Sequence, residues 1–282
     1  MERTRVILAS DVHWCHLEWY GTSNGDRLDK FVREIEAEAE NDPFAALLLL
    51  GDYSLDHWQW NVMGSYLREG ISNTENFQKT YMKRLRDTGA EVRMIAGNHE
   101  QYGEEKWEEV TEGFRRRDHL VVGDYLCILL DTYAANLDPR VHSDGCYTGV
   151  DVDEVRALMA KYPDKRVILC AHHFSPDVES EAFKTLVRED DRVLCLTSGH
   201  VHKSRVVTLN EQYGGKALLY TGHYSYSSEK EDPLRCPWGY REMILTDEGI
   251  TSRYITPAST YVLKDRTVEL PLGSIDEFDL RF

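Results

Sequence analysis

Aspartate, asparagine and histidine residues recur in five short motifs along this chain of 282 residues. Carboxylate, amide and imidazole groups are ligands for Mn, Fe or Zn, and the motifs contain no cysteine, which disfavours thiolate sites and iron–sulfur clusters. The motifs hold too many ligands for one ion, whereas two cations about 3.5–4 Å apart that share a carboxylate would use them all. They are Asp11-Val12-His13, Gly51-Asp52, Gly97-Asn98-His99-Glu100, His172-His173 and Gly199-His200-Val201-His202.

Each motif directly follows a short apolar run that is typical of a buried strand. Because the carboxyl ends of parallel strands lie along one edge of a sheet, the motifs can meet in space. The i,i+2 spacing of aspartate and histidine in the first motif, and of the two histidines in the last, points both side chains to the same side. Glycines before Asp52, Asn98 and His200 allow tight turns close to the metals. The runs are Arg5–Ser10, Ala45–Leu50, Val92–Ala96, Val167–Ala171 and Val193–Thr197.

Helical periodicity separates these strands, and hairpin strands follow them. Helices are predicted over Arg27–Glu40 and Glu104–Arg116, from Asp151 or Asp153 onward, and over Glu179–Arg188; Arg115-Arg116-Arg117 would offset the helix dipole at a C-terminus. The pocket walls are expected from Tyr53–Asn76, Thr132–Gly149 and Tyr220–Ser228. Aromatic residues near the first two motifs could stack on a substrate group or simply pack: Trp14, Trp19, Tyr20, Trp58, Trp60 and Tyr66.

In this order the motifs resemble the signature of the calcineurin-like metallophosphoesterase superfamily: D-x-H, G-D, G-N-H-[ED], H and G-H-x-H. The resemblance extends from Asp11 to His202, and GNHE and GHVH are its specific parts. It implies an α/β fold, a four-layer α/β/β/α sandwich in a single domain. We expect that domain to span residues 1–256, with a C-terminal extension, residues 257–282, packed on it or appended to it.

The resemblance also implies a role for each motif residue. One metal would be held by Asp11, His13, Asp52 and His202, and the second by Asp52, Asn98, His172 and His200. Asp52 would bridge the two ions and serve catalysis, and His99 would face the scissile phosphate or the leaving oxygen. His172, the first residue after its strand, is preferred over His173 as the ligand of the fourth motif.

The metals would be two divalent or trivalent transition ions, with Mn, Fe and Zn as candidates. Purple acid phosphatases, one branch of the superfamily, carry a metal-binding tyrosine three residues after the bridging aspartate. Leu55 stands at that position, and Tyr53 would point elsewhere. A purple-type Fe(III) site is therefore not expected.

The predicted function is two-metal-dependent hydrolysis of a phosphate ester by a metal-bridging hydroxide, with a diester favoured over a monoester. One alternative is a catalytically silent metal-binding scaffold of the same fold, which is disfavoured because the ligands and His99 are intact. The other is a nuclease that acts on short nucleic acid.

The amino-acid composition indicates which class of substrate and which cellular compartment to expect. The formal net charge of −16 repels extended nucleic acid and favours a small phosphorylated substrate. The six cysteines are scattered without a CxxC pair, which is typical of free thiols in a reducing compartment. No signal peptide or membrane-spanning run is recognised, so a cytoplasmic location without membrane contact is expected. The oligomeric state is not predicted.

Overall fold

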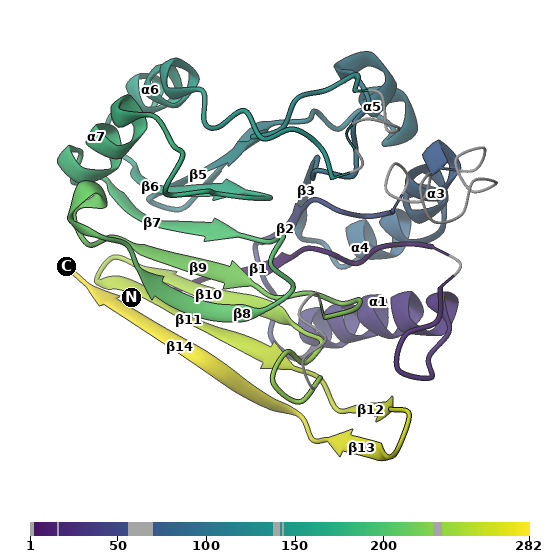
Figure 1. The fold of residues 1–282 in the computed structure, drawn as a ribbon. Helices are drawn as coiled ribbons and strands as arrows, with labels where there is room; N and C mark the ends of the chain where they lie inside the picture. Colours follow the sequence, from purple (N-terminus) through teal and green to yellow (C-terminus); the bar gives the residue numbers. More distant parts are fainter. Residues whose placement is uncertain (1–2, 16, 56–69, 138–141, 143, 228–232) are drawn as a thin grey trace.

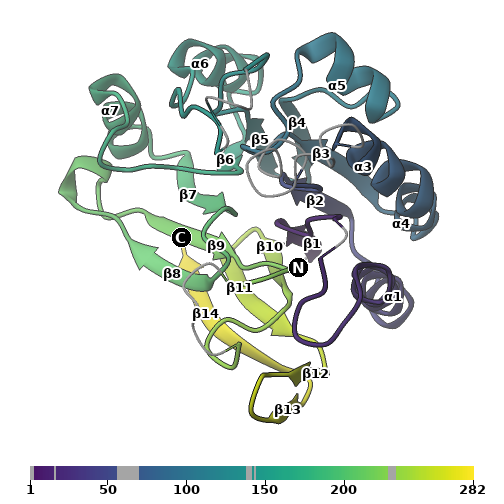
Figure 2. The same ribbon diagram turned by 45° about the vertical axis from the view of Figure 1, so that its right-hand side comes forward.

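The computed structural model describes residues 3–15, 17–55, 70–137, 142, 144–227 and 233–282. Two sheets pack face to face, and helices cover both outer faces (Figures 1 and 2). The predicted single-domain α/β/β/α sandwich is therefore confirmed.

The first sheet contains β1 (Thr4–Ala9), β2 (Ala46–Leu50), β3 (Glu91–Ile95), β10 (Tyr240–Thr246), β11 (Gly249–Thr256) and β14 (Gly273–Arg281). The second contains β4 (Asp118–Val122), β5 (Tyr125–Leu130), β6 (Arg166–Ala171), β7 (Val193–Ser198), β8 (Ser204–Thr208) and β9 (Ala217–Thr221). A separate hairpin consists of β12 (Ser259–Val262) and β13 (Thr267–Leu270).

The helices divide between the two outer faces. On the first sheet lie α1 (Asn24–Asn41), α3 (Gly70–Phe77), the π-helical turn η2 (Gln78–Met82), α4 (Lys83–Asp87) and α5 (Glu104–Val110). On the second sheet lie α6 (Val152–Lys161) and α7 (Glu181–Glu189), followed by the 3₁₀ turn η3 (Glu211–Tyr213).

Strand order brings the ends of the motif-bearing strands together. The first sheet runs β14-β11-β10-β1-β2-β3 and the second β4-β5-β6-β7-β9-β8. Strands β1, β2 and β3 are parallel, as are β5, β6, β7 and β9. The arrowheads of β7 and β9 in Figure 1 point toward the end of the sandwich where the motifs lie. The five strands predicted from the apolar runs are β1, β2, β3, β6 and β7.

The core has three apolar layers because each central strand is buried on both faces. Along β1, Ile7 and Ala9 belong to the layer under α1, whereas Val6 and Leu8 face the second sheet. Cys127, Cys170 and Cys195 lie in that middle layer as free, buried thiols, in agreement with the cysteine pattern.

The helix predicted over Glu104–Arg116 is wrong in its second half, because α5 ends at Val110. Thr111 donates its hydroxyl back to the Trp107 carbonyl (2.6 Å), and Glu112 and Gly113 adopt left-handed φ angles of 57° and 102°. A left-handed pair stops the helix. The chain then enters β4, a strand that periodicity did not predict.

The C-terminal segment after residue 256 adds to the first sheet. Strand β14 pairs antiparallel with β11 along that sheet's edge, and the β12–β13 hairpin lies at the bottom of Figure 1. Tyr261 of this hairpin is buried against Trp238. The domain boundary after residue 256 stays a prediction. Among the described residues, no helix is long and apolar enough to cross a membrane.

Candidate metal centre

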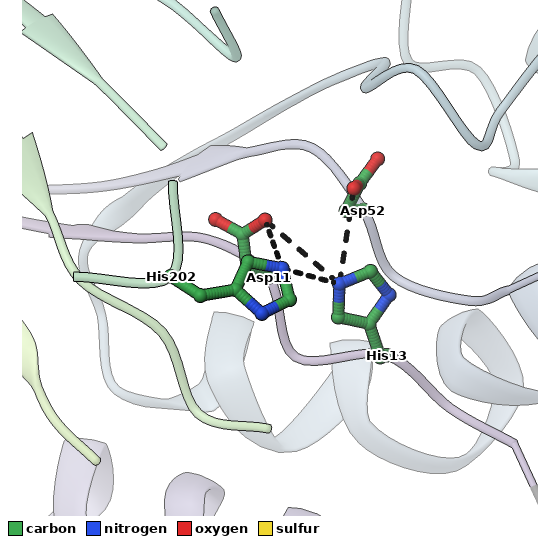
Figure 3. A group of neighbouring side chains, drawn as sticks. All are labelled: Asp11, His13, Asp52 and His202. Atoms are coloured by element: carbon green, nitrogen blue, oxygen red, sulfur yellow. Dashed lines mark hydrogen bonds and ion pairs between the residues drawn. The ribbon is translucent and has the colours of Figure 1, made fainter. Parts of the chain in front are cut away.

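The loops that follow the parallel strands bring the predicted ligands into two adjoining groups. The first cluster is Asp11, His13, Asp52 and His202, which each offer one ligand atom within 4.8 Å of the others (Figure 3). The second cluster is Asp52, His172 and His200, joined by Asn98. The Asn98 amide oxygen lies 2.9 Å from His172 Nε2 and 2.9 Å from His200 Nδ1.

Asp52 belongs to both clusters and is buried. Its Oδ2 lies 3.3 Å from His172 Nε2 in the second cluster and 3.8 Å from His13 Nε2 in the first. Its Oδ1 accepts the backbone N–H of His99 at 3.1 Å. One carboxylate oxygen therefore faces the ligand atoms of both clusters while the other is held by the backbone.

The histidine tautomers show that a cation fits here. His13 Nδ1 must donate to the Ser54 carbonyl (3.2 Å), and His202 Nδ1 must donate to the Tyr226 carbonyl (2.5 Å). Their Nε2 atoms then point lone pairs at one another across 3.0 Å (Figure 3). Two facing lone pairs repel unless a proton or a metal ion lies between them.

The second cluster also directs one imidazole nitrogen at its other ligands. His172 Nδ1 donates to the Leu50 carbonyl at 2.8 Å, so its Nε2, directed at the Asn98 amide oxygen, is the nitrogen that would ligate a metal ion. Ligand atoms about 2.1 Å from one ion and at right angles to each other would lie about 3 Å apart. The contacts of 2.9–3.3 Å in both clusters match that spacing.

The charges around Asp52 shift the pKa values of the histidines in the second cluster in opposite directions. Burial alone would lower the pKa of His172, but the Asp52 carboxylate raises it to about 9. Burial, followed by the charge of His172, lowers the pKa of His200 to about 3. A metal ion must displace the proton from His172, whereas His200 is already a neutral ligand.

Five predicted ligands have left-handed backbone conformations. The φ angles are 56° for Asp11, 45° for His13, 60° for Asp52, 68° for His200 and 49° for His202. Each non-glycine residue in this region costs about 1–3 kcal/mol, and such strain is concentrated at functional sites. The folded sheets therefore hold these ligands in positions that the local sequence disfavours.

Two glycines are needed for close approach to the ligands. A Cβ atom on Gly97 would lie 2.1 Å from Asp52 Oδ1, and one on Gly199 would lie 2.7 Å from Asp11 Oδ2. Neither position can hold a side chain without moving a carboxylate. The predicted role of these glycines agrees with this geometry.

His173 lies outside both clusters. Its ring stacks on that of His200 with centroids 4.1 Å apart, and its Nδ1 lies 2.8 Å from the Tyr133 hydroxyl. His172 points its Nε2 at Asp52 and Asn98 instead. The geometry supports His172 as the ligand and leaves His173 as a neighbour that supports His200.

Paired alanine variants separate these two roles. His172→Ala is expected to lose metal from the second cluster, because an imidazole nitrogen directed at the site disappears. His173→Ala is expected to keep both metals and to lower activity by at most about 10–100-fold, the usual cost of removing a partner of a ligand. Elemental analysis of both proteins checks this. Metal loss in His173→Ala with retention in His172→Ala would reverse the roles.

His99 is buried beside the clusters without belonging to either. Its Nε2 lies 3.8 Å from Asp52 Oδ2, and its ring lines a cleft of about 430 Å³ that opens over the site. The cleft is further lined by Asp52, Asn98, Asp144, His200, Val201, His202, Lys203, Arg205 and Tyr226. A substrate in this cleft would therefore contact His99 and the ligand residues together.

Glu100 is a buried residue whose role was not predicted, although it is the last letter of the GNHE motif. Its carboxylate accepts the backbone N–H groups of Gly97 (2.8 Å), Asp52 (2.9 Å) and Tyr53 (2.8 Å). Burial, with repulsion from Asp52, raises the pKa of Glu100 to about 7. Glu100 thus ties the second motif to the third.

Arg116 was predicted to offset a helix dipole, and this is wrong. It is buried, pairs with Asp131 (2.7 Å), and donates to the carbonyls of Glu100 (2.5 Å) and Tyr102 (2.8 Å). Arg116 therefore supports the segment that carries the third motif. A run of three arginines could not reveal which of them turns inward.

The aromatic residues near the first two motifs have mixed roles. Trp14 packs against Tyr81 and Tyr20 against Trp238, both as core contacts. Trp19 packs against Tyr226, a cleft residue, with tilted rings whose centroids are 5.1 Å apart. The hydroxyl of Tyr53 donates to Leu49 and Ile95 carbonyls, away from the site, as predicted. Trp58, Trp60 and Tyr66 lie outside the described residues.

The four-layer fold and the paired clusters are those of a candidate metal-dependent enzyme. The sequence profile of the calcineurin-like phosphoesterases matches residues 4–204, so the chain belongs to that family. The predicted resemblance is confirmed, and the protein is a metal-dependent phosphoesterase. No curated protein sequence matches the chain significantly.

Solved structures show the same fold at low sequence identity. A dimetal phosphatase from Danio rerio is similar with a TM-score of 0.66 and 13% identity, over 99% of this chain and 98% of that one. PhoD is similar with a TM-score of 0.62 and 11% identity, over 100% of this chain and 70% of that one. A purple acid phosphatase from yellow lupin seeds is similar with a TM-score of 0.56 and 11% identity, over 99% of this chain and 54% of that one.

Proposed function

We propose that this protein hydrolyses a phosphodiester with two transition-metal ions held by the two clusters. Asp11, His13 and His202 would hold one ion, and Asn98, His172 and His200 the other, with Asp52 shared. The observation that carries this proposal is the position of Asp52 Oδ2 between His13 Nε2 and His172 Nε2. When bound, the two cations polarise the phosphoryl oxygens and supply a hydroxide near neutral pH.

The chain's own groups orient the reaction. The backbone N–H of His99 holds Asp52 through Oδ1, which leaves Oδ2 directed at both clusters. The carbonyls of Ser54, Leu50 and Tyr226 set the tautomers of His13, His172 and His202. These backbone contacts hold the ligand side chains in place before a phosphate enters, which is the condition for electrostatic preorganisation.

His99 is the proposed donor to the leaving oxygen. It lines the cleft beside Asp52 and Asn98 but lies outside the ligand clusters, so a substrate in the cleft would contact its imidazole. A positioned histidine contributes by protonating a poor leaving group or by a hydrogen bond to it.

The preference for a diester rests on charge. A diester carries one negative charge, whereas a monoester carries up to two near neutral pH. The chain has a net charge of −16, and Asp144 adds a carboxylate to the cleft wall. A field of that sign disfavours the more highly charged substrate. Lys203 and Arg205 in the same cleft still allow one anion to bind. We further propose Mn, Fe or Zn as the metals.

A hydrolysis screen tests this proposal. Mn(II)-loaded protein is expected to cleave bis-p-nitrophenyl phosphate faster than p-nitrophenyl phosphate, and cyclic nucleotides extend the diester series. Chelation should abolish activity, and Mn(II) should restore it. A preference for the monoester would overturn the diester assignment alone. If protein that holds both metals hydrolyses none of these substrates, the proposed function is wrong.

A further inference from the structure

Arg27 is a buried cation that lies behind the first motif. It stands in the first turns of α1 and is 0% exposed. Its Nη1 donates to the carbonyls of Val12 (2.5 Å) and Tyr224, and its Nη2 donates to the carbonyl of His13 (2.8 Å). The Trp19 ring covers the guanidinium at 4.9 Å.

The charge of Arg27 has no carboxylate partner within salt-bridge distance among the described residues. A guanidinium stays protonated at neutral pH, so Arg27 carries its charge. A buried charge without a counter-ion is destabilising unless polar groups surround it. The carbonyl oxygens of the first motif and of Tyr224 provide that environment.

Arg27 completes the hydrogen bonds of the strained ligand loop. Asp11 and His13 are both left-handed, and their N–H groups donate to the Gly51 and Asp52 carbonyls at 3.0 Å. The Asp11 carbonyl accepts the Tyr224 N–H at 3.2 Å. The next two carbonyls, those of Val12 and His13, accept from Arg27. Because a strained loop persists only where its surroundings determine it, these donors stabilise the ligand conformation.

The same guanidinium also connects to the second histidine of the first cluster, His202. By donating to the Tyr224 carbonyl, Arg27 ties the loop to segment 224–226. In that segment the Tyr226 carbonyl accepts His202 Nδ1–H. The hydrogen bonds of Arg27 reach no residue of the second cluster, whose His172 is instead held by the Leu50 carbonyl.

We propose that Arg27 is a positioning residue for the first metal ion alone, acting through Asp11, His13 and His202. This inference rests on the ligand assignment under the proposed function. It predicts that replacing Arg27 weakens metal binding at the first site and leaves the affinity of the second site unchanged. Loss of an outer partner typically weakens metal binding by about 10–100-fold.

Mn(II) binding by the chain of 282 residues tests the inference. Arg27→Lys keeps the positive charge but loses the paired Nη1 and Nη2 donors, and Arg27→Met keeps a side chain of similar length without the charge. Arg241→Lys is the matched control, because Arg241 is equally buried and donates to Tyr220, Ser204, Ser252 and Asp276 but to no predicted ligand. Equilibrium dialysis gives stoichiometry and affinity, electron paramagnetic resonance distinguishes paired from single Mn(II), and circular dichroism checks folding.

Both Arg27 variants are expected to keep one Mn(II) at wild-type affinity and to bind the second about 10–100-fold more weakly, with the spectrum of single Mn(II). Arg241→Lys should keep the paired spectrum. If Arg27→Met does not fold, Arg27→Lys decides the matter. Wild-type affinity at both sites, or equal weakening of both, would overturn the inference and leave the proposed function intact. Wild-type protein that binds fewer than two ions would instead overturn the proposed function.

Discussion

Asp52→Asn is expected to remove most bound metal and to lower kcat by more than about 100-fold, beyond the usual cost of losing an outer partner of a ligand. The substitution keeps the size and one oxygen of the side chain but removes the charge shared by both clusters. After the substitution, Asp11 is the one remaining carboxylate among the seven predicted ligands, and it alone must offset the charge of two cations. Elemental analysis and turnover of the same preparation measure the effect.

Asp144→Asn provides the matched control for this change. Asp144 lines the same cleft but belongs to neither cluster, so its neutralisation should leave metal content unchanged. The bridging role of Asp52 would be wrong if Asp52→Asn retained two metal equivalents and near-normal turnover.

His99→Ala is expected to keep both metals and to lower kcat by about 10²–10⁴-fold on an alkyl phosphodiester, the usual range for losing a general acid. Metal is retained because the contact that holds Asp52 comes from the backbone N–H of residue 99, which alanine preserves. Turnover falls because the imidazole that lines the cleft is gone.

Leaving groups distinguish the two possible contributions of His99. A p-nitrophenolate leaves without a proton, so His99→Ala should lose less activity on a p-nitrophenyl ester than on the alkyl ester. Equal losses would indicate that His99 stabilises charge in the transition state and does not donate a proton. His142→Ala, which alters a histidine that is not among the residues lining the cleft, should behave like the wild type. Unimpaired His99→Ala would exclude the residue from the mechanism.

The central strands could be predicted because each is a short apolar run buried on both faces. Runs such as Ala46–Leu50 need no knowledge of their partners to be recognised. The helix N-termini at Asp151 and near Glu179 were also marked locally, since Asp151 and Ser180 accept backbone N–H groups as caps. The end of α5 was missed because its signal is the backbone conformation of Glu112 and Gly113.

The sequence by itself determined the fold class, the family and the residues that can bind metal, because these depend on residue type, order and spacing. Tertiary structure alone decided how those residues meet. It placed Asp52 Oδ2 between two histidines from different sheets and turned His172 inward while His173 stacks on His200. It also buried Arg27 and Glu100 where they hold the ligand loops. These are contacts between segments distant in the chain, and a left-handed φ at Asp11 or His202 is stable only when such contacts outweigh the local preference of the backbone.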